Sequence, residues 1–213
     1  FNPQTGAGLT SVKVEMGADV NTSSGTEPAT KRSADEPANV YRGAGWHFAA
    51  DAKSINPHVK VEILRWGEPS WTENDFDKRY QWYKETIDAV YDAFGIQIDY
   101  VSPGQNERND MSTTNKLNLD WIKFFAKRLK AETSGRYDYS QIKIVAADTY
   151  RKPETAALIL ADPELVQLID VFSYHYDLKG HPSLTTLSQE HGIEVWYGEG
   201  IAPMVKADNR INA

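Results

Sequence analysis

Short apolar stretches alternate along this chain with segments of helical periodicity, and this alternation limits the possible folds more than any other feature. The stretches have the length and composition of strands that are covered on one or both faces. We expect six strands, at 9–17, 59–64, 96–101, 142–146, 169–174 and 192–197. Helical patterns fill most of the gaps between them, which predicts a parallel sheet covered by helices.

The predicted helices carry apolar residues at steps of three and four. The longest, at 75–94, is followed by Gly95, a residue typical of the position just past a helix end. Further helices are expected at 41–56, 113–133 and 153–168, the last of them broken near Pro163. We expect only a short connection between the last two strands. Residues 19–39 are polar and without a period, so we expect a long loop there that is either disordered or functional.

Two α/β architectures fit such an alternation, a (β/α)8 barrel and an open dinucleotide-binding sheet. No Gly-x-Gly-x-x-Gly turn follows the first strand, which argues against dinucleotide binding. Polar or aromatic residues follow the strands, as they do in barrel enzymes. A whole barrel takes about 250 residues. We therefore expect a single domain at 1–213, a (β/α)8 TIM-barrel fragment that covers about strands 2 to 7.

Composition excludes several classes of function. The formal net charge of -7 provides no basic surface for a nucleic acid. No apolar run approaches the roughly 20 residues that span a bilayer, and the start of the chain lacks the basic and apolar regions of a signal peptide, which leaves secretion of a processed chain open. The absence of Cys removes disulfides, thiolate metal sites and Cys nucleophiles. The 6 Trp and 11 Tyr favour a sugar-binding cleft.

Two glutamates directly follow predicted strands, Glu107 in SPGQNER and Glu199 in VWYGEG. If the first predicted strand is the second strand of a barrel, they follow the fourth and seventh strands, on opposite sides of the barrel mouth. Two long side chains then bring their carboxyls to the roughly 5 Å that a retaining glycosidase requires. Taken alone, Glu107 beside Arg108 is better explained as a surface ion pair, and Glu199 between two glycines as an exposed turn carboxylate. Their strand-end positions together favour catalysis.

Seven motifs follow one another in a fixed order: VKVEMG at 12–17, GTEP at 25–28, RWGEPSW at 65–71, NER at 106–108, AD at 147–148, YHY at 174–176 and YGEG at 197–200. Together they resemble glycoside hydrolase family 59, the galactosylceramidases. The resemblance implies that Glu107 is the general acid/base and Glu199 the nucleophile of a retaining mechanism. It also implies that Thr26 and Trp66 contact the galactose and that Asn106 hydrogen-bonds its 2-hydroxyl.

The resemblance implies a retaining β-glycosidase that hydrolyses a β-galactoside, such as a galactosylceramide-like glycolipid, without a cofactor or metal. It also implies a secreted or extracytoplasmic location, lysosomal in animal relatives. The family's first and eighth strands and its sandwich and lectin-like domains have no counterpart in the sequence, so self-association through open sheet edges is expected. The turn 198–200 is looser than the family's Ser-Glu-Asp, which leaves two alternatives: a β-glucosidase or β-xylosidase of a related barrel family, or a non-catalytic carbohydrate-binding barrel fragment.

Two further polar residues end predicted strands. His175 lies between two tyrosines, and no second His or carboxylate stands at metal-ligand spacing. We therefore expect His175 to be a hydrogen-bonding rim residue that contacts the substrate, and we expect no metal site. Asp148 either orients a neighbouring side chain or lies at the N-terminus of the next helix.

Overall fold

Six parallel strands form one curved sheet in the computed structural model, which describes residues 1–22, 25–73, 75–104, 119–149, 152–175 and 179–200. The strands are β1 (Ser11–Glu15), β4 (Lys60–Leu64), β5 (Tyr100–Ser102), β6 (Lys143–Thr149), β7 (Val171–His175) and β8 (Glu194–Glu199). They pair in the order β1-β4-β5-β6-β7-β8, so each strand lies beside the next one of this sheet along the chain. A separate antiparallel ribbon joins β2 (Asn21–Thr22) to β3 (Gly25–Thr26).

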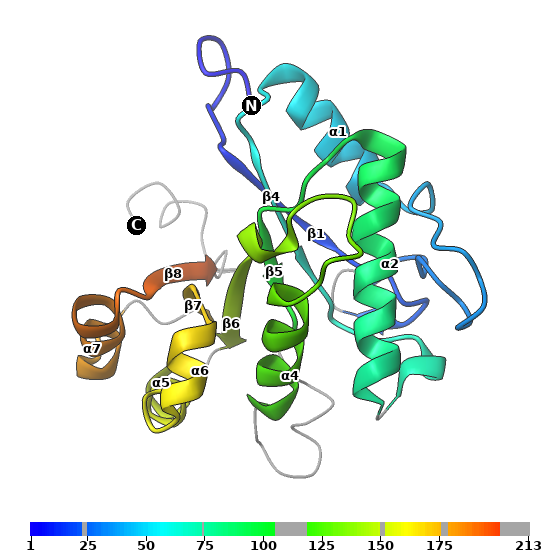
Figure 1. Ribbon diagram of the computed structural model, residues 1–213. Helices are drawn as coiled ribbons and strands as arrows, with labels where there is room; N and C mark the ends of the chain where they lie inside the picture. The colour runs from blue at the N-terminus through cyan, green and yellow to red at the C-terminus, as the bar shows by residue number, and fades with distance from the viewer. Residues whose placement is uncertain (23–24, 74, 105–118, 150–151, 176–178, 201–213) are drawn as a thin grey trace.

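Helices follow the strands and cover one side of the sheet (Figure 1). They are α1 (Gly45–Ile55), α2 (Phe76–Phe94), α4 (Leu119–Lys130), α5 (Lys152–Leu160), α6 (Pro163–Leu168) and α7 (Pro182–His191), with 3-10 turns η1 (Ser70–Thr72) and η2 (Tyr139–Gln141). In Figure 1, α2 and α4 lie side by side, and α5, α6 and α7 gather beside β6, β7 and β8. The architecture is a partial (β/α)8 barrel, as the sequence predicts.

The two faces of the sheet differ in chemistry because successive strand residues point to opposite faces. On β1, Val12 and Val14 belong to the hydrophobic core shared with the helices, while Lys13 between them points to the other face. The same alternation places Glu62 of β4 and Ser173 of β7 on the face away from the helical layer. The interior face of the partial barrel therefore carries polar and charged side chains.

Helix α2 begins one residue after the predicted start at 75 and ends at the predicted residue, and its flanking residues explain both boundaries. Asp75 precedes the helix, and its side chain accepts a hydrogen bond of 3.0 Å from the Lys78 amide. Gly95 follows the helix with φ of 65°, a left-handed conformation that favours glycine. The predicted Pro163 break also exists, since α5 ends at Leu160 and α6 begins at Pro163.

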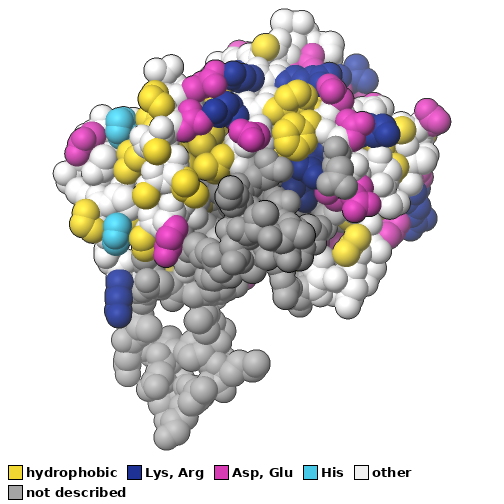
Figure 2. Space-filling view, turned by 90° about the horizontal axis from the view of Figure 1, so that it is seen from below, with side chains coloured by type: hydrophobic (Ala, Val, Ile, Leu, Met, Phe, Trp, Pro, Cys, Tyr) yellow, Lys and Arg dark blue, Asp and Glu magenta, His cyan; other side chains and the backbone are white. Residues whose placement is uncertain are grey.

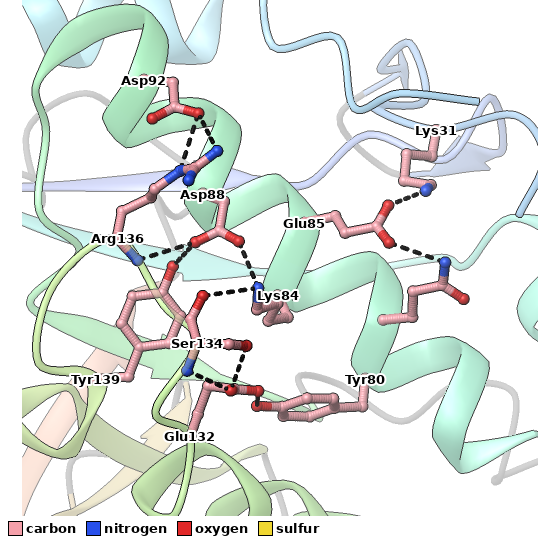
Figure 3. Close-up of polar contacts among 11 residues, drawn as sticks. Lys31, Tyr80, Lys84, Glu85, Asp88, Asp92, Glu132, Ser134, Arg136 and Tyr139 are labelled. Carbon is pink, nitrogen blue, oxygen red and sulfur yellow. Dashed lines mark hydrogen bonds and ion pairs between the residues drawn. The ribbon is translucent and has the colours of Figure 1, made fainter. Parts of the chain in front are cut away.

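Polar contacts attach the loop after α4 to one face of α2 (Figure 3). Asp88 of α2 accepts hydrogen bonds from Lys84 Nζ, at 2.7 Å, and from the Tyr139 hydroxyl. Glu132 of the loop accepts one of 3.0 Å from the Tyr80 hydroxyl. These contacts fix the chain that leads into β6, and β6 carries part of the site described below.

The structure contains two elements that were not expected from the sequence. A helix, α7, fills the last gap, where we expected a short connection; Leu184 and Leu187 alone attach it to the core, too few to show a period. The loop at 19–39 contains the β2–β3 ribbon. The predicted helix at 113–133 is described from Leu119 onwards. No helix in the described ranges has the length and apolar character that crossing a membrane requires.

Candidate active site

The carboxyl ends of the parallel strands bring polar residues from distant parts of the sequence to one rim of the partial barrel. Ser102 ends β5, His175 ends β7 and Glu199 ends β8, while Asp148 is the penultimate residue of β6. Trp66 follows β4 by two residues. Figure 2, seen from below the view of Figure 1, shows acidic, basic and hydrophobic side chains interspersed on the described part of that face, without an extended basic patch.

A bulge in β6 turns Asp148 toward the barrel interior. In the pairing with β7, Ala147 lies opposite Ser173 and Thr149 opposite Tyr174, so Asp148 is an extra residue without a partner of its own. Ala147 and Asp148 have φ of 75° and 41°, values that a residue with a side chain rarely adopts. Such strain costs on the order of 1–3 kcal/mol per residue and concentrates at functional sites.

Asp148 lies at the centre of a buried polar cluster. Its Oδ1 accepts hydrogen bonds of 2.7 Å from the Ser173 hydroxyl and from His175 Nε2, and its Oδ2 pairs with Lys13 Nζ. Asp148, Ser173 and His175 are buried. Three strands, β1, β6 and β7, therefore contribute side chains to one carboxylate cluster.

The second nitrogen of His175 faces Glu199. His175 Nδ1 lies 3.1 Å from Glu199 Oε2. A second irregularity makes this possible, because Tyr174 pairs with Tyr197 and His175 with Glu199, which leaves Gly198 as an extra residue in β8. The side chain of Glu199 is 34% exposed, although its Oε2 is buried. Glu199 thus reaches the open rim with one oxygen held inside the barrel.

Charges of alternating sign continue from this cluster toward β4. Lys13 Nζ also lies 3.5 Å from Glu62 Oε1. Burial raises the pKa of Glu62 to about 7, and the Lys13 charge offsets only part of this effect. Burial acts in the same direction on Asp148, but the hydrogen bond from His175 and the Lys13 charge outweigh it and lower the pKa of Asp148 to about 2. Asp148 is therefore ionised at neutral pH.

A third carboxyl with a displaced pKa ends β1. Burial and the neighbouring Glu27 raise the pKa of Glu15 to about 7.

No group of three or more His, Asp or Glu side chains in the described ranges is arranged to hold a metal ion.

The sequence profile of glycosyl hydrolase family 59 matches residues 1–210. The chain belongs to glycosyl hydrolase family 59. Membership in family 59 agrees with the order of motifs found in the sequence and with the polar rim of a partial barrel.

Galactocerebrosidases are similar to this family 59 chain in sequence. The galactocerebrosidase of Macaca mulatta is 34% identical over 184 residues, which cover 83% of this chain and 24% of that protein. The Homo sapiens galactocerebrosidase is 33% identical over 184 residues, which cover 83% of this chain and 24% of that protein. The chain thus spans about a quarter of the length of these curated relatives.

Solved barrel structures are similar to the chain in fold. SrfJ from Salmonella typhimurium superposes with a TM-score of 0.69 at 20% identity, covering 96% of this chain and 51% of that one. The endo-β1,6-glucanase BT3312 superposes with a TM-score of 0.67 at 16% identity, covering 92% of this chain and 50% of that one. At such identities these likenesses show the fold alone. Because about half of each neighbour is matched, they confirm a partial barrel.

The structure brings together only part of the predicted family 59 site. His175 and Glu199 are in contact, as described above. Asn106 and Glu107 lie outside the described residues, so the predicted distance between the two glutamates stays a prediction. The contact of His175 with substrate also stays a prediction, since its two nitrogens face protein carboxylates. Of the two roles considered for Asp148, the contacts with Ser173 and His175 support orientation of a neighbour.

The two predicted sugar contacts lie in adjoining segments of the same rim. Thr26 is exposed on the β2–β3 ribbon, and its hydroxyl lies 3.5 Å from Asn21 Oδ1. Trp66 is partly buried, and its Nε1 has no hydrogen-bond partner among the residues that the structure describes. The segment before the ribbon approaches the Trp66 loop closely, since a Cβ atom on Gly67 would lie 3.0 Å from Val20 Cβ.

Sequence reasoning missed Lys13 and Ser173. The signal for Lys13 was present, because a lysine between two core valines on a strand must point to the opposite face. Nothing in the sequence around Ser173 indicated that it donates to a carboxylate 25 residues away.

Proposed function

We propose that the protein is a retaining β-glycosidase of family 59 that hydrolyses a β-galactoside, a galactosylceramide-like glycolipid or another galactoside. The observation that carries the proposal is Glu199, a carboxylate at the end of a barrel strand with one oxygen held near His175 and the side chain open to the rim. Active sites of such barrels lie at this end of the strands. The similarity to galactocerebrosidases supports galactose as the sugar.

In the proposed mechanism Glu199 attacks the anomeric carbon while Glu107 donates a proton to the leaving-group oxygen. The C–O bond to the aglycone breaks and a glycosyl ester of Glu199 forms. Glu107, now ionised, then removes a proton from a water molecule that attacks the same carbon, which releases the sugar with retained configuration and restores both groups.

Protein groups around the two glutamates assist this sequence. Asn106 holds the 2-hydroxyl, a contact that strengthens as positive charge develops on the ring. Trp66 offers an aromatic ring and an unused N–H donor to the sugar. The exposed Thr26 adds a hydroxyl from the neighbouring ribbon. We also propose an extracytoplasmic location, as expected from the family resemblance.

Azide rescue tests the role of Glu199. Glu199→Gly is expected to lose hydrolysis of an aryl β-galactoside, and added azide is expected to restore turnover and give the α-galactosyl azide, because azide enters from the face that the carboxylate vacates. Glu199→Gln is expected to bind the sugar without turnover. Glu194→Gln is the matched control, since Glu194 is exposed at the start of the same strand and pairs with Lys143. Unaltered hydrolysis by Glu199→Gly would contradict the assignment.

A panel of chromogenic glycosides tests the sugar. Preferred turnover of the β-galactoside is expected. Preference for a β-glucoside or β-xyloside would leave the proposed roles of the two glutamates in place and contradict galactose as the sugar. Saccharide binding without turnover of any glycoside in the panel would favour a non-catalytic carbohydrate-binding protein.

A further inference from the structure

Five side chains of alternating charge cross the interior of the partial barrel. They are Glu62, Lys13, Asp148, His175 and Glu199, and they come from β4, β1, β6, β7 and β8. The proposed reaction uses only the last member of this row. The centre of this row, Asp148 and His175, is buried, and buried charges require good pairing because each unpaired charge would cost several kcal/mol.

From this geometry we propose that Asp148 is a positioning residue, which acts through His175 to hold the Glu199 carboxylate in the orientation and ionised state that attack on a sugar requires. The inference rests on the proposed function of Glu199. Asp148 is not proposed to touch the substrate. Its effect reaches the nucleophile through the imidazole.

The ring of His175 transmits this effect because both of its nitrogens face carboxylate oxygens. Asp148 Oδ1 lies 2.7 Å from Nε2, and Glu199 Oε2 lies 3.1 Å from Nδ1. A neutral imidazole has one N–H, so one of its nitrogens would present a lone pair to a carboxylate. A doubly protonated ring satisfies both sides. The ionised Asp148 stabilises that form, and the resulting cation favours ionised Glu199.

The local backbone supports a positioning role over a simple ion pair with Lys13. Asp148 reaches the cluster through a bulge with left-handed φ at two successive residues that carry side chains. Glu199 reaches it through a second irregularity, at Gly198. Each of these two strand irregularities places one carboxylate, that of Asp148 or that of Glu199, beside His175. An ion pair between Lys13 and a carboxylate needs neither.

Asp148→Asn tests the proposal because it keeps the shape of the side chain and removes its charge. The protein contains 5 His, so the NMR signal of the His175 ring is identified by its absence in His175→Gln. We expect the titration midpoint of that signal to fall by about one pH unit or more in Asp148→Asn. We also expect kcat on an aryl β-galactoside to fall about 10-fold to 100-fold with little change in KM, and the acidic limb of the pH profile to move upward.

Two matched variants separate positioning from structural support. Ser173→Ala removes one hydrogen bond to Asp148 Oδ1 and no charge, so the His175 titration is expected to stay within a few tenths of a pH unit of the wild-type value. Lys13→Met removes the lysine charge that pairs with Asp148 and keeps the Asp148 charge beside His175, so the midpoint is expected to stay or rise. Circular dichroism confirms that each variant is folded.

Folded Asp148→Asn with an unchanged His175 titration would overturn the proposal. An unchanged pH profile with a shifted His175 signal would overturn the link to the nucleophile. Failure of the proposed function has a different signature: the NMR shift would appear as expected, while Glu199→Gly would keep its activity.

Discussion

Gly198 of β8 lies against Asp148 of β6, so close that a Cβ atom placed on Gly198 would stand 2.7 Å from Asp148 Oδ1. The same Cβ would collide with the Ser173 hydroxyl. Glycine at this position therefore allows β8 to close over the carboxylate. The contact joins the two irregular strands, β6 and β8, on which the site depends.

Gly198→Ala is expected to displace Ser173 and Asp148 and to lower kcat on the β-galactoside about 10-fold or more, at a cost of about 1–3 kcal/mol in the free energy of unfolding, as for other overpacked sites. Steady-state kinetics and urea denaturation measure the two effects. Gly180→Ala is the control, because a Cβ atom added at Gly180 would meet no atom of the described residues within 4 Å and the φ of this residue is not left-handed. Equal kcat and equal stability in the two variants would contradict the close contact of Gly198 with Asp148.

Glu62→Gln is expected to flatten the dependence of stability on pH. Burial raises the pKa of Glu62 to about 7 from 4.5, so between these values the folded protein keeps a proton that the unfolded chain releases. The free energy of unfolding must then fall as pH rises through this window, by an amount on the order of 3 kcal/mol. Urea denaturation at pH 5 and pH 8 measures this slope. Glu190 is exposed, so Glu190→Gln is the control and should keep the wild-type slope. A wild-type slope in Glu62→Gln would show that the Glu62 carboxyl is solvated and would contradict the prediction.

Trp66→Phe is expected to lower kcat/KM about 10-fold without loss of stability. The Trp66 N–H is buried and has no partner in the described part of the chain, so its removal deletes a donor that a sugar hydroxyl would use and relieves the protein of an unpaired group. Trp71→Phe is the matched control. Trp71 donates to the Lys31 carbonyl at 3.1 Å, so this variant should lose about 1 kcal/mol of stability and keep its activity. Loss of stability with full activity in Trp66→Phe, and loss of activity in Trp71→Phe, would contradict the role of Trp66 in sugar binding.

Tyr139→Phe is expected to lower the free energy of unfolding by about 2 kcal/mol, because a buried hydroxyl donates to the Asp88 carboxylate and bonds to charged groups are the stronger ones. Chemical denaturation measures the loss. Tyr91 lies on the same helix as Asp88, and its hydroxyl has no hydrogen-bond partner among the described residues, so Tyr91→Phe should change stability by less than about 0.5 kcal/mol. A loss of equal size in both would show that the Asp88 contact contributes nothing.

Much of the fold is predictable from the sequence because its signals are local. The period of α2 and its Gly95 terminus lie within one segment, and the structure confirms both. The cap at Asp75 is also a local feature, although the helix was expected to begin at this residue rather than after it. The helix α7 was missed because Leu184 and Leu187 give it only two core contacts, and β8 then follows through Gly192. A helix held by so few side chains has no period to detect.

The site is less predictable because its geometry depends on contacts between distant strands. Glu199 and His175 were found from their strand-end positions and the family motifs. The β6 strand was expected to end at residue 146, and no residue preference predicts left-handed φ at Ala147. The inward turn of Asp148 follows from that bulge and from the space left by Gly198, which only the packed strands reveal.

The most direct test of Glu199 as the nucleophile is covalent trapping with an activated 2-deoxy-2-fluoro-β-galactoside, followed by proteolysis and mass spectrometry of the labelled peptide. We expect time-dependent inactivation with one fluorosugar attached to Glu199. A label on any other residue, or turnover of β-galactosides by a protein that never becomes labelled, would contradict it.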